Sequence, residues 1–177
     1  MRPSEIEKIL AAEEILVDTR EQETSSARWR YKAFGCPWRR EKLDAGDYTA
    51  EFGSGEKRYS LQGLAAVERK MSLDELCACF TSERARFARE FERARAAGTR
   101  LYLLVEGATW EKVYRGDYRS RLAPKALVAS LMTWMARYDC RVVFCESRSS
   151  GRLIADILRY EARERLEHTI NNEETER

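Results

Sequence analysis

Short apolar runs separated by turn-forming residues predict a sheet whose strands are spread along the chain. The β-branched run at 15–17 ends in Asp18, and the continuous apolar runs at 101–105 and 142–145 have the length of buried strands. Glycines after the alternating stretch at 46–52 predict a hairpin. Strands are expected at residues 15–18, 38–43, 46–52, 58–62, 65–70, 101–105 and 142–145.

Capping residues and apolar periodicity predict four helices. Ser72 caps the first helix, Gly98 ends the second, and Pro124 opens the third. We expect these helices at residues 72–80, 82–97, 124–138 and 151–166. Residues 19–36 show no clear period and are predicted to be a loop.

The order of these elements indicates the fold class. Hairpin-linked strands come first, and helices then alternate with strands, which favours an α/β fold with one mixed β-sheet flanked by helices on both faces. A length of 177 residues with 44% hydrophobic residues suits a single domain. We expect an N-terminal extension at 1–13, the domain at 14–166, and an acidic, disordered tail at 167–177.

Composition narrows the chemistry. The single histidine, His168, excludes most Ser-His-Asp and Cys-His catalysis and any zinc site with two histidines. The 25 arginines against 7 lysines favour recognition of phosphates or carboxylates. Five cysteines without Cys-x-x-Cys spacing indicate reduced thiols. Because no signal peptide and no membrane-spanning run is present, we expect an intracellular, cytoplasmic protein without a membrane partner.

Residues 28–42 combine six positive charges with aromatic side chains. Cations that contact phosphates, interleaved with aromatic faces, are typical of a nucleic-acid surface and would suit a single-stranded flap. The alternative is a solvated loop whose aromatic residues enter the core. The DNA-binding candidates in this segment are Arg28, Arg30, Trp38 and Arg39.

Carboxylates stand at the ends of three predicted strands. Asp18 follows one strand, Asp47 opens another, and Glu68 and Lys70 end a third. Residues two apart on a strand project to the same face, so Lys70 lies beside the cation that Glu68 would hold. Phosphodiester hydrolysis needs a divalent cation on oxygen ligands, and this pattern is the nuclease signature PD-(D/E)xK. By itself the Glu-Arg-Lys sequence also fits a solvated strand end.

The wider string of motifs resembles one family. Asp18-Thr19-Arg20-Glu21, Gly46-Asp47, Glu68-Arg69-Lys70 and Asp74 occur in the order found in XPF-type (ERCC4-domain) structure-selective endonucleases. The resemblance covers about residues 14–165 and corresponds to the nuclease domain only. It implies a restriction-endonuclease-like core and a catalytic set, which is Asp18, Glu21, Asp47, Glu68, Arg69, Lys70 and Asp74.

The resemblance also implies individual roles. Asp47 and Glu68, with the carbonyl of Arg69, would hold Mg²⁺ or Mn²⁺, and Asp18 would bind or support the metal. Lys70 would position or activate the water. Arg20, Glu21, Arg69 and Asp74 would lock the carboxylates, with Glu75 as an alternative for the last motif position. Arg84 would face the scissile phosphate, with Arg86 as the alternative, and Arg20, Arg84 and Arg86 are DNA-binding candidates.

Two helices carry more apolar surface than one core face needs. In helix 124–138 one apolar stripe contains Leu131 and Trp134, and a second contains Met135; Ile157 and Tyr160 lie on the last helix. Nucleases of this family dimerise through this region, so we expect a homodimer with these five residues at the interface. The alternative is that both helices are buried within the monomer.

These observations predict a metal-dependent DNA endonuclease acting on branched, flap or single-strand/double-strand junction DNA. Two alternatives stay open: a catalytically inert nuclease-fold subunit that binds DNA or a partner, and a nuclease of the same fold without structure selectivity. The family usually continues into a tandem helix-hairpin-helix domain, which this sequence lacks. We therefore expect dimerisation, a recruiting protein or residues 28–42 to replace its grip on DNA.

Overall fold

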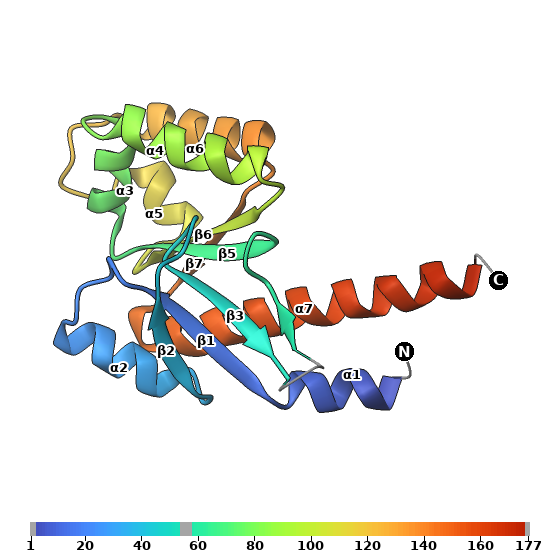
Figure 1. The fold of residues 1–177 in the computed structure, drawn as a ribbon. Helices are drawn as coiled ribbons and strands as arrows, with labels where there is room; N and C mark the ends of the chain where they lie inside the picture. The colour runs from blue at the N-terminus through green and yellow to red at the C-terminus, as the bar shows by residue number, and fades with distance from the viewer. Residues whose placement is uncertain (1–2, 54–57, 176–177) are drawn as a thin grey trace.

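Helices cover both faces of one mixed sheet in the computed structural model, which describes residues 3–53 and 58–175 (Figure 1). Seven strands of the described residues form the sheet, in the order β2-β1-β3-β5-β6-β7 with β4 paired to β3. The pairs β1/β2, β5/β6 and β6/β7 are parallel, and β3 pairs antiparallel with β1, β4 and β5. The strands are β1 (Glu13–Asp18), β2 (Trp38–Glu41), β3 (Tyr48–Phe52), β4 (Tyr59–Ser60), β5 (Ala65–Lys70), β6 (Arg100–Glu106) and β7 (Arg141–Cys145).

The helices connect these strands and form two layers. The four predicted helices are present, although the last is longer than expected. They are joined by two short helices near the N-terminus, one after β6, and a 3₁₀ turn. The helices are α1 (Pro3–Leu10), α2 (Ser25–Ala33), α3 (Leu73–Phe80), α4 (Arg84–Ala96), α5 (Trp110–Arg115), α6 (Pro124–Tyr138) and α7 (Ser150–Thr175), and the 3₁₀ turn is Ser147–Ser149.

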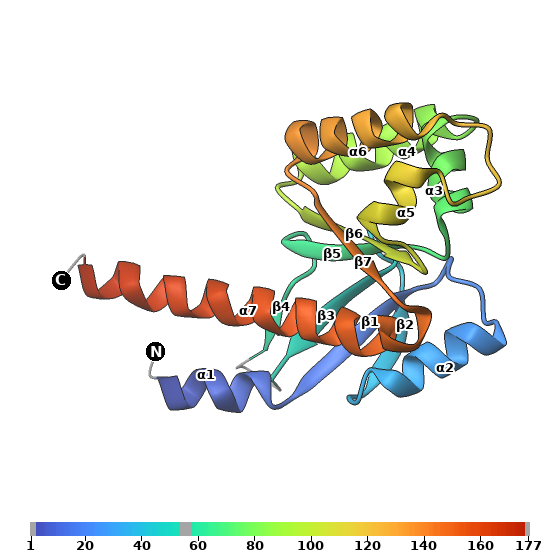
Figure 2. The same ribbon diagram turned by 180° about the vertical axis from the view of Figure 1, so that it is seen from behind.

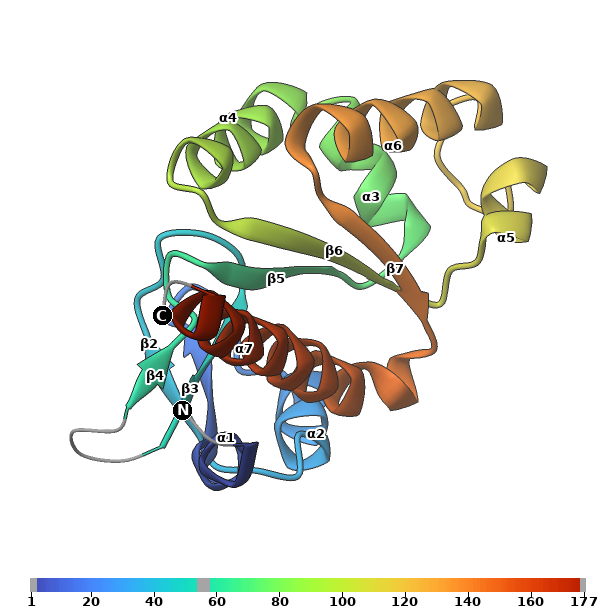
Figure 3. The same cartoon turned by 90° about the vertical axis from the view of Figure 1, so that its right-hand side faces the viewer.

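Alternation along the central strands divides the hydrophobic interior between the two faces. Ala66 and Leu103 enter a core with α3, α4 and α6, where the Trp134 ring lies 5.0 Å from the Phe80 ring. Val67 enters a second core on the other face, with α1, α2 and α7. Figures 2 and 3 show α7 crossing this second face beside α1. The predicted mixed sheet with helices on both faces is therefore confirmed.

The predicted loop at 19–36 contains helix α2, so this prediction is wrong. Thr24 caps the helix by accepting a hydrogen bond from the Ala27 amide, and the buried positions are Ala27, Arg30 and Tyr31. These positions have helical spacing, but one of them is an arginine. The apolar period that normally reveals a helix is therefore interrupted in the sequence.

Both ends of the chain extend the expected domain. In the extension at 1–13, Ile6 and Leu10 are buried in the second core, and α1 packs on α7. Helix α7 continues to Thr175, so the tail expected to be disordered from residue 167 is helical over 167–175. Lengthening a packed helix is inexpensive once its nucleus exists, even through polar residues. No helix within the described residues is long and apolar enough to span a membrane.

Candidate active site

Asp47 joins the ends of two strands. Its amide donates to the Val67 carbonyl at 2.8 Å, and its carbonyl accepts from the Asp18 amide at 2.8 Å. Its carboxylate oxygen Oδ2 accepts from the Arg69 amide at 2.8 Å. These backbone bonds bring the Asp18, Asp47 and Glu68 segments to one end of the sheet.

Gly46 makes this arrangement possible. Its φ of +73° is in the left-handed region that favours glycine. A Cβ atom at this position would come within 3.0 Å of the Ala66 Cβ and of the Val67 carbonyl oxygen. The Gly-Asp motif therefore has a structural cause, because only glycine allows the chain to approach β5 closely enough for Asp47 to bond to it.

Glu68 and Lys70 lie on the same face of β5 and touch. The Lys70 ammonium contacts the Glu68 carboxylate, and both residues are buried, with exposed fractions of 7% and 4%. The Lys70 Nζ also lies 5.3 Å from the centre of the Phe87 ring of α4. The apolar wall around this ion pair strengthens its electrostatic interactions.

The site disfavours the ionised forms of its two carboxyl groups, Glu68 and Asp47. Burial raises the pKa of Glu68 to about 7; the nearby Lys70 opposes this rise and the Glu90 carboxylate adds to it. Burial and the Glu68 carboxylate raise the pKa of Asp47 well above its ordinary value. Because burial disfavours ionisation of both carboxylates and the Glu68 charge adds to the effect on Asp47, a bound cation would relieve them.

Asp18 has a different environment from that implied by the resemblance. Its carboxylate accepts from the Arg20 amide at 2.7 Å, from Arg20 Nε and Nη2 at 2.7 and 2.9 Å, and from the Leu43 amide at 2.9 Å. Burial would raise the pKa of Asp18, but these hydrogen bonds lower it. With both oxygens engaged, Asp18 supports the loop and is not placed as a metal ligand.

The last motif position is also engaged elsewhere. Asp74 accepts hydrogen bonds from the amides of Arg119 and Ser120 at 2.7 and 3.0 Å and from Arg119 Nε at 3.1 Å. Glu75, the alternative, accepts from the Met71 amide at 2.7 Å. Asp74 therefore anchors the loop before α6, and Glu75 closes the start of α3.

Arg30 does not belong to an exposed DNA surface, so this prediction is wrong. It is 3% exposed, and its guanidinium donates to Glu106 at 3.2 Å, to Tyr48 at 3.1 Å and to Glu21 at 3.4 Å. Arg69 donates to the same Glu21 at 3.1 Å. Glu21 and Arg69 therefore stabilise the site from the opposite face of β5.

The remaining basic residues of 28–42 fall into paired and unpaired groups. The prediction that Arg39 is free to bind DNA is wrong, because its guanidinium pairs with Glu14, Glu41 and Glu51. By contrast, Arg28 and Lys32 are exposed on α2, and neither forms an ion pair within the described part of the chain. Two tryptophans accompany them, Trp29 at 49% and Trp38 at 39% exposure.

The other DNA-binding candidates are exposed. The Arg20 side chain is 62% exposed although it pairs with Asp18. Arg84 is exposed, with its guanidinium 5.1 Å from the Trp134 ring, and the exposed Arg86 pairs with Glu83.

The predicted dimer residues separate by burial. Leu131 and Trp134 are 0% and 1% exposed inside the first core, so their assignment to an interface is wrong; the first stripe of α6 is core. Met135 and Ile157 are half-buried and Tyr160 is 60% exposed, so these three face outward at least in part.

The carboxylates fit a hard divalent cation. Within residues 3–53 and 58–175, no group of three or more His, Cys, Asp and Glu side chains is arranged to hold a metal. Two carboxylates remain, Asp47 and Glu68, and Mg²⁺ is often bound by one or two carboxylates while it keeps several waters. Oxygen donors with raised pKa values match that chemistry.

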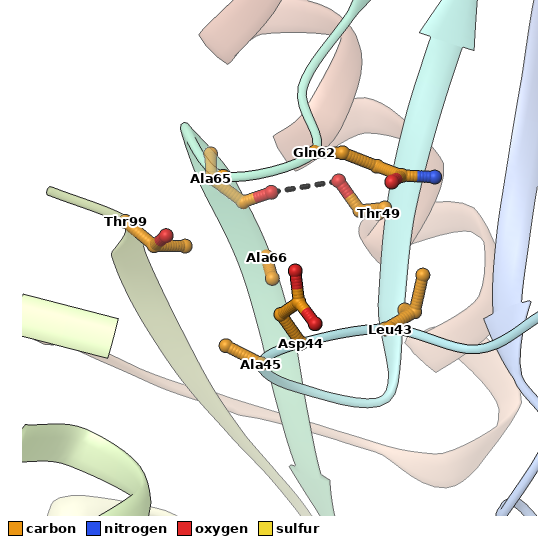
Figure 4. A pocket seen from close by; sticks show the side chains of 9 residues that line it. Leu43, Asp44, Ala45, Thr49, Gln62, Ala65, Ala66 and Thr99 are labelled. Atoms are coloured by element: carbon orange, nitrogen blue, oxygen red, sulfur yellow. Dashed lines mark hydrogen bonds between the residues drawn. The ribbon is translucent and has the colours of Figure 1, made fainter. Parts of the chain in front are cut away.

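A small hollow lies elsewhere on the sheet. It lies between β3 and the start of β5, where the Thr49 hydroxyl donates to the Ala65 carbonyl at 2.7 Å (Figure 4). The hollow has a volume of about 20 Å³. This volume suits a single water, and neither Asp47 nor Glu68 lines it.

Sequence reasoning missed two acidic residues near the site. Glu90 of α4 acts on the pKa of Glu68, and Glu106 at the end of β6 contacts Arg30 and Arg69. Glu106 follows an apolar strand, as Asp18 does, so its position carried a signal. Glu90 carried none, because it lies among the alternating charges of α4.

The comparisons with known proteins identify the family. A family model for the ERCC4 domain matches residues 17–157. The chain belongs to the ERCC4 domain family. The match includes every motif from Asp18 to Asp74, and nucleases of this family are generally dependent on divalent metals. No curated protein matches the chain.

Solved structures show the same fold for this ERCC4 domain. Two structures of XPF from Aeropyrum pernix, one of them in complex with DNA, match it with TM-scores of 0.54 and 0.57 at 20% sequence identity. The matches cover 82% and 87% of this chain and 65% of each XPF chain. The restriction-endonuclease-like fold is therefore confirmed. The chain spans just under two thirds of those relatives' length.

Proposed function

We propose that this ERCC4 domain is a Mg²⁺- or Mn²⁺-dependent DNA endonuclease. The observation that carries the proposal is a pair of carboxylates at one end of the sheet. Asp47 accepts a hydrogen bond from the Arg69 amide, next in the chain to Glu68, and the buried Glu68 contacts Lys70. Paired acidic oxygens next to a buried ammonium suit hydrolysis of a phosphodiester. The inert-subunit alternative would be supported by loss of these carboxylates, and both are present.

Each residue has a distinct role in the proposed reaction. Asp47 and Glu68 would hold the cation, with the Arg69 carbonyl as the further ligand implied by the family resemblance. When bound, the cation activates water and neutralises charge on the phosphate. Lys70 would orient the attacking water and stabilise the negative charge on the non-bridging phosphate oxygens. The water oxygen would bond to phosphorus as the bond to the leaving sugar oxygen breaks, with the water losing a proton to solvent and the leaving oxygen taking one from solvent. Asp18 holds the loop beside the site.

The DNA surface in this proposal is the outward face of α2 with the start of β2. Arg28 and Lys32 are one helical turn apart and free to contact phosphates, and Trp29 and Trp38 offer ring faces to bases. Arg20, Arg84 and Arg86 would contact the duplex near the scissile phosphate. The XPF structure in complex with DNA supports DNA as the ligand of this fold.

Selectivity for flap, branched or junction DNA is the finer part of the proposal. A homodimer that buries the outward residues Met135, Ile157 and Tyr160, or a recruiting protein, would supply the additional grip. A cytoplasmic location also stays a proposal.

A cleavage assay on four DNA substrates of one sequence tests the function. Flap, splayed-arm, four-way-junction and plain duplex DNA are incubated with the protein in Mg²⁺, in Mn²⁺ and in EDTA. We expect cleavage of the branched substrates in either metal and none in EDTA. Equal cutting of all four would discard structure selectivity, and absence of cutting with retained DNA binding would favour an inert subunit.

A further inference from the structure

Five side chains from five segments meet on the face of β5 opposite to Glu68 and Lys70. Two of them are glutamates, two are arginines that pair with those glutamates, and the fifth is a tyrosine whose hydroxyl bonds to both kinds. We call them the Glu21 cluster, and they are Glu21 after β1, Arg30 of α2, Tyr48 of β3, Arg69 of β5 and Glu106 of β6.

One oxygen of Glu21 collects three donors. Glu21 Oε1 accepts from the Tyr48 hydroxyl at 2.8 Å, from Arg69 Nη2 at 3.1 Å and from Arg30 Nη1 at 3.4 Å. The three donors come from separate elements. Glu21 thereby fixes the relative positions of α2, β3 and β5 with one group.

Glu106 closes the cluster from the other side. Its Oε1 accepts from Arg30 Nε at 3.2 Å and lies 3.6 Å from Arg69 Nη1. Arg30 and Glu106 are 3% and 5% exposed. Two guanidinium groups and two carboxylates balance, so the loss of one member leaves an uncompensated buried charge.

The cluster adjoins both proposed metal ligands in the chain. Tyr48 directly follows Asp47, and Arg69 directly follows Glu68. The Arg69 amide also donates to the Asp47 carboxylate at 2.8 Å. Movement of Arg69 or Tyr48 would therefore change the distance between the two carboxylates.

The backbone around Arg30 is shaped for close packing. A Cβ atom at Gly151, the second residue of α7, would collide with the Arg30 carbonyl oxygen, so the glycine allows α7 to press on α2 at this point. The position of the Arg30 guanidinium is thus set by packing as well as by its ion pairs.

We propose that Arg30 and Glu106 are positioning residues for the metal site. They hold Arg69 and Glu21, and through them they set the spacing of the Asp47 and Glu68 carboxylates. This inference rests on the proposed function for its effect on cleavage. Its effect on geometry and on metal affinity stands apart from any activity.

A second buried glutamate provides a matched control. Glu161 of α7 is 7% exposed and accepts from Arg100 at 3.0 Å, Tyr102 at 2.7 Å and Arg165 at 2.9 Å. It resembles Glu106 in burial and partners, but Arg100 begins β6 whereas Glu106 ends it. Glu161→Gln therefore measures the cost of a disturbed buried glutamate away from the site.

The test compares Glu106→Gln with Glu161→Gln in the full chain. We expect Glu106→Gln to weaken Mn²⁺ binding, measured by electron paramagnetic resonance, by about tenfold or more and to lower kcat by a similar factor. DNA affinity in Ca²⁺ and the KM for DNA should change less than about twofold. Glu161→Gln should lower the melting temperature and leave Mn²⁺ binding unchanged. Equal Mn²⁺ affinity in wild type and Glu106→Gln would overturn the proposal.

Crystal structures separate this proposal from the proposed function. In metal-free Glu106→Gln we expect the Arg69 amide to lose its hydrogen bond to Asp47; an unchanged bond would overturn the inference even if the wild type cut no DNA. A wild type that binds Mn²⁺ without cutting would remove only the proposed function. If Glu106→Gln does not fold, Tyr48→Phe, which deletes one hydroxyl from the cluster, undergoes the same measurements with the same criteria.

Discussion

At the residue scale, the site depends on adjacent residues of β5 whose side chains project to opposite faces of the sheet. Glu68 and Lys70 face the α4 side, and Arg69 between them projects to the opposite side, where it belongs to the Glu21 cluster. The Glu-Arg-Lys motif thus places its acid and its lysine at the reaction and its arginine in the supporting layer. The Asp47 carboxylate accepts from the Arg69 amide, so it is bonded to the backbone that separates the two faces of β5.

Lys70→Met should lower turnover more than metal binding. The methionine keeps the apolar contact with Phe87 but removes the ammonium that orients water and opposes charge on the phosphate. We expect kcat to fall by roughly 10² or more, which is the range of lost general acid–base contributions. Mn²⁺ affinity should change less than about tenfold. An unchanged kcat would refute the role of Lys70.

The residues of this site differ in how far the sequence could reveal them. Glu68 and Lys70 are predicted to share a face because residues two apart on a strand project the same way, and Asp47 is predicted from its place at a strand end and from the motif order. Arg30 was misassigned, because an arginine among exposed arginines gives no signal of burial until its partners from distant segments, Glu21 and Glu106, are placed. The hydrogen bond that the Leu43 amide donates to the Asp18 carboxylate likewise joins residues far apart in sequence.

At the element scale, α2 carries a buried charged residue on one face and exposed charged residues on the other. One face of α2 buries Arg30 and Tyr31, and the opposite face exposes Arg28, Trp29 and Lys32. Strands were predicted from apolar runs with correct order and near-correct limits. Helix α2 was not, because its buried face includes a charged residue.

The outward face of α2 should contribute to single-strand affinity. Arg28→Ala combined with Lys32→Ala should weaken binding of a single-stranded oligonucleotide by about tenfold and reduce the slope of log affinity against log salt by roughly 0.7 for each lost phosphate contact. Fluorescence anisotropy over a salt series measures both. The control, Lys125→Ala with Arg137→Ala on α6, removes the same charge; an equal effect there would assign the loss to net charge alone.

The free energy of unfolding should depend on pH because of Glu13, which lies where β1 meets α7. Burial raises the pKa of Glu13 from 4.5 to about 7, with Arg159 opposing the rise. Between these values the folded state keeps a proton that the unfolded state has lost, so stability falls as pH rises through this window. Glu13→Gln should gain stability relative to wild type, by up to about 3 kcal/mol, between pH 4.5 and pH 8.

Denaturant titrations of both proteins at several pH values measure this difference. Glu161→Gln supplies a control of opposite sign. Burial opposes the shift, but hydrogen bonding to Tyr102 and the charges of Arg100 and Arg165 lower the pKa of Glu161, so its contribution is present above its unfolded pKa and is lost at lower pH. A flat difference for Glu13→Gln across the window would contradict the assigned burial.

At the scale of the whole molecule, a hydrophobic core on each face of the sheet packs against the strands that carry the site. Helices α3, α4 and α6 cover the face with Glu68 and Lys70, and α1, α2 and α7 cover the face with Arg69. Strand β7 ends the sheet, with half-buried side chains from Val142 to Cys145. The outward side of α6 carries Met132 at 43% exposure.

Sedimentation velocity at tens of micromolar should show a homodimer. Met132→Lys places a charge on the outward side of α6 and should shift the protein to monomer without changing its melting temperature. Tyr114→Lys on α5, where the tyrosine is 61% exposed, is the matched control and should stay dimeric. A monomeric wild type would remove the dimer from the proposal and leave grip on DNA to α2 or a recruiting protein.

Cleavage of flap DNA by Asp47→Asn and Glu68→Gln tests the central claim most directly. Both variants keep size and hydrogen bonding but remove a charge from the proposed cation site, and Asp44→Asn, at an exposed neighbouring aspartate, is the control. We predict that wild type and Asp44→Asn cut in Mg²⁺ and not in EDTA, and that each site variant loses cleavage by about 100-fold or more while DNA binding is kept. Full cleavage by either site variant, or wild-type cleavage in EDTA, would contradict the account.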